Sequence, residues 1–314
     1  MTAGPSDVER VRTVFLGSGS FGAPALRRLA AHPCVELVGI VTAPTRPVGR
    51  RQVPTPTPIG ALALELGLAP LLTPARLRAP GAVEAVLALR PGLVVLADYG
   101  QIVPPALLDL PHGALNLHPS ALPRWRGASP VPATILAGDA ITAVTLMRMD
   151  VGLDTGPIVA QAPVSLLGHE TAPDLEARLA VVAAELLAAS LDPWLDGTLV
   201  ARPQPAEGMT ITRPLRREDG RLDPSVPAAA LERRVRAFLP WPGTFLESDG
   251  ERLVVTAASV APSEPGDVPG SVVPHGDRPA LATADGRLVL DAVTPPGRRP
   301  MSGADYLRGR RRPA

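Results

Sequence analysis

Residues 11–191 alternate short apolar runs with stretches of helical periodicity, and this alternation limits the possible folds more than any other feature of the chain. Such a pattern is typical of parallel strands joined by crossover helices. We therefore expect a doubly wound α/β domain with a mainly parallel sheet. The expected strands are Val11–Leu16, Val35–Val41, Leu93–Ala97, Gly113–Leu117, Ala143–Met149 and Ile158–Leu166. The expected helices are Ala25–Ala31, Ile59–Leu66, Ala82–Leu89, Val131–Ala137 and a long helix from an N-cap at Thr171 to about Ser190.

The pattern changes after Pro203 to short strands and turns. Expected strands cover Arg252–Thr256, Ser271–Val273 and Ala280–Val293, the last with an Asp-Gly hairpin signal at residues 285–286. One helix is expected, at Ala228–Phe238. We predict a catalytic domain over residues 8–200, a Pro-rich linker over 201–207, and a small, mostly β, OB-like barrel domain over 208–312.

Composition narrows the class of protein. A formal net charge of +1 is too small for a protein that coats nucleic acid, although residues 201–314 hold 17 of the 31 Arg. The chain has no apolar run long enough to span a bilayer and, with Asp7 and Glu9 near its start, no expected signal or transit peptide. A single cysteine, Cys34, excludes an internal disulfide; we expect it to be buried at a strand start and without a nucleophilic role. We expect a cytoplasmic monomer.

Asn116 is the only asparagine in a chain that lacks lysine altogether, and it stands two residues before His118. Residues 116–127 read NLHPSALPRWRG and follow a predicted strand. Ligands of α/β sheets bind beyond the carboxyl ends of the strands. Asn116 and His118 are therefore candidates for a functional site, although either could instead serve a turn or the core.

A second predicted strand end carries residues 150–157, DVGLDTGP. Its glycines permit a tight loop that turns a carboxylate back toward the histidine. If the two strand ends are adjacent, Asn116, His118 and Asp154 converge. This convergence is the sharpest functional prediction from the residues themselves.

Residues 17–22, GSGSFG, match the dinucleotide fingerprint G-x-G-x-x-G after the first strand. A nicotinamide enzyme would also need an acidic residue at the end of the second strand, where this chain has Val41-Thr42-Ala43-Pro44. We interpret the glycines as a tight turn that lets the backbone approach a ligand.

Together these motifs resemble the 10-formyltetrahydrofolate-dependent formyltransferases. The resemblance covers nearly the whole chain and includes further segments: FLGS at 15–18, RPVGR at 46–50, YGQI at 99–102, RAFLPWP at 236–242 and PMS at 300–302. The two C-terminal segments are similar to members that act on a charged tRNA, rather than to those that formylate sugars or a purine precursor.

The resemblance implies roles for three residues. Asn116 donates its amide N–H to the oxyanion formed from the formyl carbonyl, His118 donates or shuttles protons, and Asp154 sets the charge and orientation of the imidazole. The implied formyl donor is 10-formyltetrahydrofolate, and neither a metal nor a covalent intermediate is required. The implied acceptor is the amino group of initiator methionyl-tRNA.

The folate is expected against the loop Ser120, Ala121, Leu122 and Pro123, with Leu96 and Tyr99 on the neighbouring strand end. The family usually has Leu where this chain has Ala121, so a looser pocket wall is expected.

Arg46, Arg50 and Arg51 fall in the loop that reaches the tRNA acceptor end in the resembling enzymes. Gln52 and Val53 stand where that loop tends to carry two lysines, a departure that weakens tRNA binding or moves it to other arginines. Trp125 and Trp241 are expected to pack rather than to stack on bases. The basic end at residues 308–312 is either a tRNA contact or a frayed tail.

Two alternatives stay open. One is an N-formyltransferase for an amino-sugar nucleotide, which would not need the C-terminal domain. The other is a non-catalytic folate or tRNA binder on the same scaffold, against which the retention of Asn116, His118 and Asp154 argues.

Overall fold

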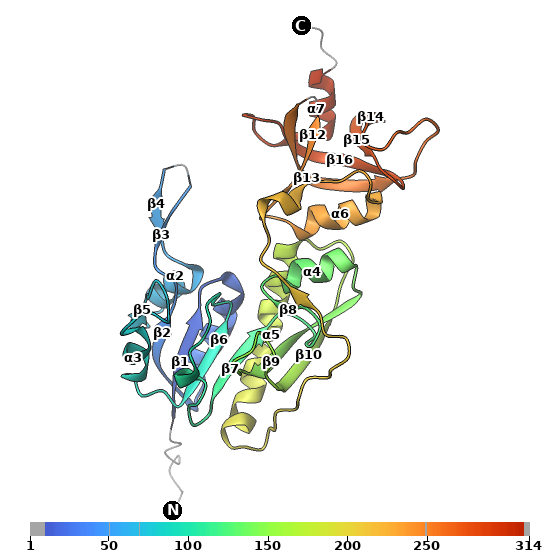
Figure 1. Ribbon diagram of the computed structural model, residues 1–314. Coiled ribbons are helices and arrows are strands. Elements are labelled where there is room, and N and C mark those ends of the chain that lie inside the picture. Colours follow the sequence, from blue (N-terminus) through green and yellow to red (C-terminus); the bar gives the residue numbers. More distant parts are fainter. Residues whose placement is uncertain (1–9, 50, 69, 249, 311–314) are drawn as a thin grey trace, which may run out of the picture. The chain divides into compact units, whose positions relative to one another are not determined.

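The computed structural model describes residues 10–49, 51–68, 70–248 and 250–310, which fall into two compact units (Figure 1). The first unit takes residues up to Pro130, Ile141–Ser165 and Glu176–Thr212. The second takes Val131–Ala140, Leu166–Leu175 and the residues from Arg213 on.

A seven-stranded sheet forms the centre of the first unit, with strand order β10-β9-β7-β6-β1-β2-β5. Its strands are β1 (Val11–Gly17), β2 (Val35–Val41), β5 (Leu71–Leu72), β6 (Leu93–Ala97), β7 (Ala114–His118), β9 (Ile141–Arg148) and β10 (Ile158–Ser165). The helices of the first unit are α1 (Ala23–Ala30), α2 (Pro58–Glu65), α3 (Ala82–Leu87) and most of α5 (Ala172–Leu195), with short 3-10 turns at Ser20–Gly22 and Pro105–Leu107. All but the first residue of the helix α4 (Pro130–Ala137) and the first turn of α5 fall in the second unit. The predicted α/β class is confirmed.

The middle strands are apolar because both of their faces are covered. Every residue of β6 and β7 is buried, as is typical of central parallel strands. The edge strand β10 instead alternates buried with more exposed residues. Parallel pairing sets Leu96 of β6 beside Asn116 of β7, which brings two of the predicted site residues to one edge of the sheet.

One part of the predicted strand arrangement is wrong. The sheet is parallel from β5 through β7, but β9 runs antiparallel to β7, with His118 paired to Thr145 and Leu115 paired to Arg148. The carboxyl end of β9 therefore lies opposite the start of β7, not beside its end. The loop after β9 folds back over the sheet, and this fold-back brings Asp154 to His118. A sequence pattern reports that a strand exists but not its direction.

A hairpin of β3 (Arg46–Val48) and β4 (Val53–Thr55) was not predicted. It projects from the first unit next to α2 (Figure 1). All of its strand residues are exposed, including Val48 and Val53. The sequence of this hairpin shows no hydrophobic periodicity, because no face of the hairpin is buried.

The second unit contains an antiparallel sheet in the order β12-β13-β16-β15-β14, with β17 paired to β16. Its strands are β12 (Thr244–Ser248), β13 (Glu251–Ala261), β14 (Val272–His275), β15 (Arg278–Ala282), β16 (Arg287–Thr294) and β17 (Met301–Ser302). The helices α6 (Ala228–Ala237) and α7 (Gly303–Arg310) and a 3-10 turn at Arg217–Gly220 accompany it. The predicted mostly β domain and the hairpin at residues 285–286 are confirmed, whereas α7 and β12 were missed.

Two smaller points concern predicted local structure. Thr171 caps α5 as expected, since its hydroxyl accepts a hydrogen bond from the Asp174 amide. Cys34 directly precedes β2 but is half-buried, not buried as predicted. Across the described residues, no helix combines the length and the apolar character needed to cross a membrane.

Candidate active site

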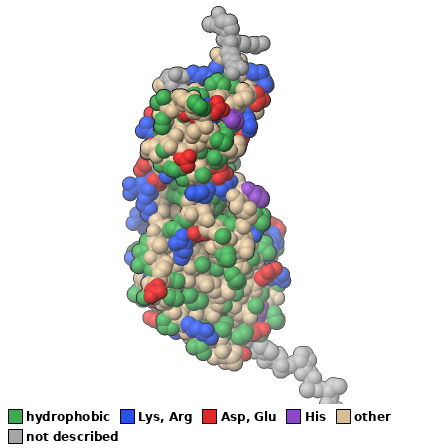
Figure 2. Space-filling view, turned by 90° about the vertical axis from the view of Figure 1, so that its right-hand side faces the viewer, with side chains coloured by type: hydrophobic (Ala, Val, Ile, Leu, Met, Phe, Trp, Pro, Cys, Tyr) green, Lys and Arg blue, Asp and Glu red, His purple; other side chains and the backbone are tan. Residues whose placement is uncertain are grey.

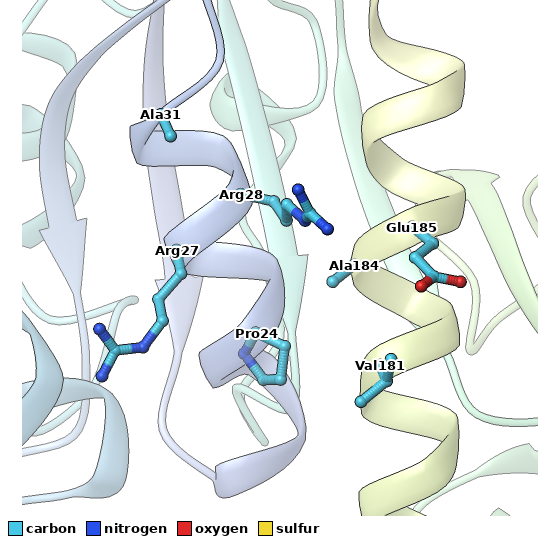
Figure 3. Close-up of a pocket in the computed structure, with 7 residues that line it drawn as sticks. All are labelled: Pro24, Arg27, Arg28, Ala31, Val181, Ala184 and Glu185. Carbon is cyan, nitrogen blue, oxygen red and sulfur yellow. The ribbon is translucent and has the colours of Figure 1, made fainter.

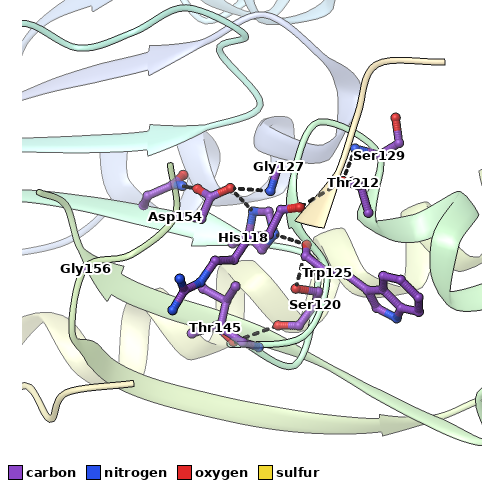
Figure 4. Close-up of polar contacts among 12 residues, drawn as sticks. His118, Ser120, Trp125, Gly127, Ser129, Thr145, Asp154, Gly156 and Thr212 are labelled. Atoms are coloured by element: carbon purple, nitrogen blue, oxygen red, sulfur yellow. Dashed lines mark hydrogen bonds and ion pairs between the residues drawn. The ribbon is translucent and has the colours of Figure 1, made fainter. Parts of the chain in front are cut away.

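Asn116 and His118 lie on β7, and both are buried, at 6% and 5% exposed. His118 Nε2 lies 2.9 Å from the carbonyl oxygen of Trp125 (Figure 4). Because a carbonyl only accepts, Nε2 carries the proton in this contact. His118 Nδ1 then faces Asp154 Oδ2 at 3.7 Å, which becomes an ion pair when the ring is protonated. The ring is thus held between a backbone acceptor and a carboxylate.

Asp154 connects the three predicted residues. Its Oδ2 accepts a hydrogen bond of 2.7 Å from the backbone N–H of Gly127, and its Oδ1 lies 3.5 Å from Asn116 Nδ2. Asp154 has a positive φ of 51°, a backbone conformation that Asp tolerates better than most residues. The structure therefore brings Asn116, His118 and Asp154 into one cluster, by way of the fold-back loop.

The loop between His118 and Gly127 is fixed by buried and partly buried hydrogen bonds. The Ser120 hydroxyl donates to the Arg124 carbonyl at 2.7 Å, and Thr145 Oγ1 donates to the Ser120 carbonyl at 2.7 Å (Figure 4). Gln161 Nε2 donates to Thr145 Oγ1 and to the Leu122 carbonyl. The Ser120 side chain is thereby occupied within the protein. Leu122 and Pro123 are buried as well, so this loop exposes mainly its backbone and the half-buried Ala121.

A short parallel pair of strands, β8 (Arg126–Gly127) with β11 (Ile211–Thr212), closes the same loop from the other side. The Trp125 amide donates to Thr210 Oγ1 at 2.8 Å, and Thr212 Oγ1 donates to the Arg126 carbonyl at 2.9 Å. A chain segment more than 80 residues away thus sets the backbone conformation beside His118.

Gln204 is a site residue that the sequence did not reveal. Its Nε2 donates to the carbonyls of Asp154 and Gly156, at 2.8 and 2.7 Å. Its Oε1 accepts two hydrogen bonds from the Arg126 guanidinium. This one side chain therefore ties the Asp154 loop to the His118 loop. The only available signal was a polar residue between Pro203 and Pro205 in a segment predicted as a linker.

Two buried polar atoms at this edge of the sheet have no hydrogen-bond partner among the described residues: Asn116 Oδ1 and the Tyr99 hydroxyl. Tyr99 follows β6 and packs with Leu96 in the core, and burial raises the pKa of Tyr99 to about 12. A buried polar atom without a partner is costly unless a ligand or water satisfies it. Asn116 Oδ1, which belongs to the cluster with His118 and Asp154, is suited to a polar substrate bound there.

In the G-x-G-x-x-G segment, the space beside Gly19 is filled by the carboxylate of Asp98. A Cβ on Gly19 would lie 1.5 Å from Asp98 Oδ2, so the glycine makes room for that side chain. Part of the Asp98 side chain is exposed. Its buried part has lost hydration, and this raises the pKa of Asp98; the nearby negative charge of Glu176 raises it further, by a smaller amount. A second anion at this turn would meet like charge, which agrees with the interpretation of these glycines as a tight turn.

The predicted tRNA-binding arginines lie away from the cluster. Arg46 is on β3, Arg51 is in the turn of the same hairpin, and both are exposed; Arg50 lies outside the described residues. Of the two tryptophans singled out, Trp125 is half-buried beneath the Arg124 guanidinium at 4.1 Å. Trp241 in the second unit is 52% exposed, with Arg217 at 5.9 Å.

A cavity of about 410 Å³ also lies in the first unit, between α1 and α5 (Figure 3). It is lined by Pro24, Arg27, Arg28, Ala31, Val181, Ala184 and Glu185. None of the predicted site residues borders it.

Two family models match the chain: formyl transferase over residues 11–191, and the formyl transferase C-terminal domain over residues 214–311. Together with this fold, they show that the chain belongs to the formyl transferase family and is a transferase enzyme.

The relatives narrow the class further. Methionyl-tRNA formyltransferase of Roseiflexus sp. (strain RS-1) is 43% identical over 303 residues, covering 96% of this chain and 93% of the relative. The enzyme of the same name from Myxococcus xanthus (strain DK1622) is 42% identical over 307 residues, with 96% of each chain covered. Among solved structures, an N-formyltransferase from Helicobacter canadensis, in complex with folinic acid and dTDP-3-aminofucose, shares the fold at a TM-score of 0.66 and 15% identity, covering 89% of this chain and 98% of that one.

Proposed function

We propose that this enzyme transfers the formyl group of 10-formyltetrahydrofolate to the amino group of initiator methionyl-tRNA. The products are N-formylmethionyl-tRNA and tetrahydrofolate. The observation that carries the proposal is the cluster of Asn116, His118 and Asp154 in a chain that matches methionyl-tRNA formyltransferases along both of its family domains. With these substrates, the enzyme would act in the cytoplasm.

When bound, the folate supplies an activated formyl carbon on N10. The amine nitrogen of the acceptor forms the new C–N bond, the bond from carbon to N10 breaks, and one proton passes from the amine to N10. The site must therefore stabilise negative charge on the formyl oxygen and transfer that proton.

Asn116 fits the first task. Asn116 Nδ2 lies 3.5 Å from Asp154 Oδ1, so one of its protons faces the carboxylate, and the second proton donates to the formyl oxygen as negative charge develops there. The buried Oδ1, which has no partner among the described residues, accepts a hydrogen bond from the incoming amine. One amide thus orients both reacting groups.

His118 fits the second task. With Nε2 on the Trp125 carbonyl, Nδ1 is the nitrogen that takes a proton from the amine and passes it to N10. Asp154, at 3.7 Å, stabilises the imidazolium in between. The 2.7 Å hydrogen bond from the Gly127 amide keeps the carboxylate oriented toward the ring.

The folate would lie against the backbone of residues 120–123 and near Leu96, with the Tyr99 hydroxyl as a further polar contact. The acceptor would be held by arginines, because their guanidinium groups pair with phosphates. Arg46 and Arg51 on the exposed hairpin and Arg217 beside the exposed Trp241 are suited to this. On the face drawn in Figure 2, arginines form small groups among polar and apolar side chains, which favours local contacts over a broad basic field.

The test is transfer of labelled formyl from 10-formyltetrahydrofolate to three parallel acceptors: initiator Met-tRNA, elongator Met-tRNA and an amino-sugar nucleotide. Transfer selective for initiator Met-tRNA is expected. Transfer to the sugar alone would replace the proposal by a sugar N-formyltransferase, and folate binding without any transfer would indicate a non-catalytic scaffold.

A further inference from the structure

His32, Cys34 and Asp192 form a cluster of three different ligand types in the first unit, outside the candidate active site. One ligand atom from each residue lies within 4.8 Å of the other two. His32 Nε2 is 3.7 Å from Asp192 Oδ1, and the His32 side chain is only 10% exposed, whereas that of Asp192 is 58% exposed. The cluster is open to solvent on its carboxylate side, so an ion can enter from there.

The backbone that carries the first two ligands is firmly held. His32 and Cys34 flank Pro33 in the turn between α1 and β2, and proline restricts the backbone of that turn. The His32 amide donates to the Leu29 carbonyl, and the Val11 amide of β1 donates to the Cys34 carbonyl at 2.8 Å. Asp192 comes from α5, which lies beside α1 (Figure 3). The two sides are thus positioned by separate, packed elements.

We propose that His32, Cys34 and Asp192 bind a zinc ion, with water as the fourth ligand. Zinc prefers imidazole, thiolate and carboxylate ligands in tetrahedral geometry, whereas magnesium and calcium prefer all-oxygen sites. The thiolate and the carboxylate together neutralise the two charges of the ion.

The geometry needs only a small contraction. Zinc bonds of about 2.0–2.3 Å place tetrahedral ligand atoms roughly 3.5 Å apart, compared with the upper limit of 4.8 Å in this cluster. A metal-bound neutral imidazole carries its proton on the other nitrogen. If Nε2 binds the ion, His32 Nδ1 gives up its contact with the Cys34 amide, which is 3.4 Å long and therefore weak.

Cys34 Sγ lies within 4.8 Å of an Asp192 carboxylate oxygen, and a free thiol carries its proton at neutral pH. A zinc ion replaces that proton, because a coordinating thiol is deprotonated outright. Binding therefore releases a proton. The bound ion would also link the turn before β2 to the C-terminal part of α5, and would stabilise the first unit by mass action.

The experiment is titration of the purified full chain with Co²⁺ in a thiol-free reducing buffer, followed by displacement with Zn²⁺. Cys34 is the only cysteine of the chain, so a sulfur-to-cobalt charge-transfer band can come from this residue alone. We expect one Co²⁺ per chain, a tetrahedral ligand-field spectrum and loss of both signals when Zn²⁺ is added. Zn²⁺ should also raise the Tm of the apo protein.

Cys34→Ser should abolish the charge-transfer band and the rise in Tm. Asp192→Asn changes an exposed side chain of a long helix and should weaken Zn²⁺ binding by more than about 100-fold. Loss of a residue that only hydrogen-bonds to a zinc ligand would typically cost about 10- to 100-fold in affinity, so a larger loss indicates direct binding. His275→Gln is the matched control, because His275 pairs with Glu264 at 3.8 Å but has no thiol nearby in the described structure; this variant should bind Zn²⁺ like the wild type. Absence of the sulfur band, or unchanged Zn²⁺ affinity in both Cys34→Ser and Asp192→Asn, would overturn the proposal.

Discussion

The backbone amide of Gly127 donates a 2.7 Å hydrogen bond to the carboxylate of Asp154, 27 residues further along the chain. This bond joins the loop that follows β7 to the loop that follows β9. It orients the carboxylate that faces His118, so the conformation of a residue without a side chain helps to set the geometry of the cluster of Asn116, His118 and Asp154.

Gly127→Ala should lower both stability and kcat. Gly127 has a positive φ of 97°, and a Cβ there would lie 2.3 Å from the backbone carbonyl oxygen of Thr212, which cannot move without disturbing β11. We expect a loss of about 1–3 kcal/mol in the free energy of unfolding. Urea denaturation and the formyl transfer assay measure the two effects.

Gly197→Ala is the control for backbone strain alone. Gly197 also has a positive φ, of 79°, but no atom lies within 4 Å of a Cβ placed there. It should lose stability and keep kcat. If both variants kept kcat, the bond between Gly127 and Asp154 would have no part in catalysis.

Asn116→Ala should reduce kcat by roughly 10²–10³-fold, the typical loss for one donor to a developing oxyanion. The variant should fold normally, because the Asn116 amide makes only a 3.5 Å contact and leaves Oδ1 without a partner in the described structure. Steady-state kinetics with initiator Met-tRNA, alongside Tm, provides the measurement. Activity within about threefold of wild type at an unchanged Tm would exclude the assigned role.

Gln204→Met should lower kcat by roughly 10- to 100-fold with little change in KM for tRNA, because small misplacements of reacting groups are costly. Methionine keeps the length of the side chain but loses the bonds to the Asp154 and Gly156 carbonyls. Gln204→Glu keeps an oxygen for Arg126 but replaces the two N–H donors by a carboxylate oxygen that faces the Asp154 and Gly156 carbonyls. A wild-type kcat for Gln204→Met would show that the Asp154 loop holds itself in place.

Arg46→Ala combined with Arg51→Ala should raise KM for tRNA far more than it lowers kcat. Both side chains are exposed on the β3–β4 hairpin, so their loss removes phosphate contacts without disturbing the core. The dependence of KM on salt should also become shallower. The matched control is Arg76→Ala with Arg78→Ala, two exposed arginines elsewhere in the first unit. Equal effects of the two pairs would mean that only net charge matters.

Asp219→Asn should destabilise the second unit at neutral pH by about 1 kcal/mol. Asp219 binds the Arg213 guanidinium through both oxygens and accepts a hydrogen bond from the Arg216 amide. Chiefly through the bond to Arg213, these contacts lower the pKa of Asp219 to about 2. A lowered pKa stabilises the fold above the unfolded-state pKa of about 3.9, and this stability is lost as the pH falls toward 2.

The difference between wild type and Asp219→Asn should therefore be constant near pH 7 and shrink below about pH 4. Urea denaturation followed by tryptophan fluorescence measures this difference. Trp241 is the only tryptophan of the second unit and supplies the part of the signal that comes from it, whereas Trp125 and Trp194 report on the first unit. A difference that persists unchanged at the lowest pH would assign the effect to a cause other than the charge of Asp219.

Hydrophobic patterning was enough to predict most of the central sheet, because strands buried on both faces are mainly apolar; β6 is entirely apolar, and β7 departs from this only at Asn116 and His118. It did not predict the β3–β4 hairpin, whose residues are exposed, or the two-residue strands β8 and β11. The hairpin has no buried face, and β8 and β11 form through hydrogen bonds to each other across more than 80 residues, so neither leaves a periodic pattern in the sequence.

The sequence by itself determined the fold class of this protein and the functional groups available to it. It predicts an α/β sheet, one asparagine and one histidine at the end of a strand, and an aspartate in a glycine-containing loop. Only the tertiary structure decided how these residues meet. The antiparallel direction of β9, the fold-back of the loop that follows it, and the Gln204 bridge all depend on contacts between segments far apart in the chain. Strand direction and long-range hydrogen bonds are set by the packing of the whole unit, whereas residue types and their spacing are local properties.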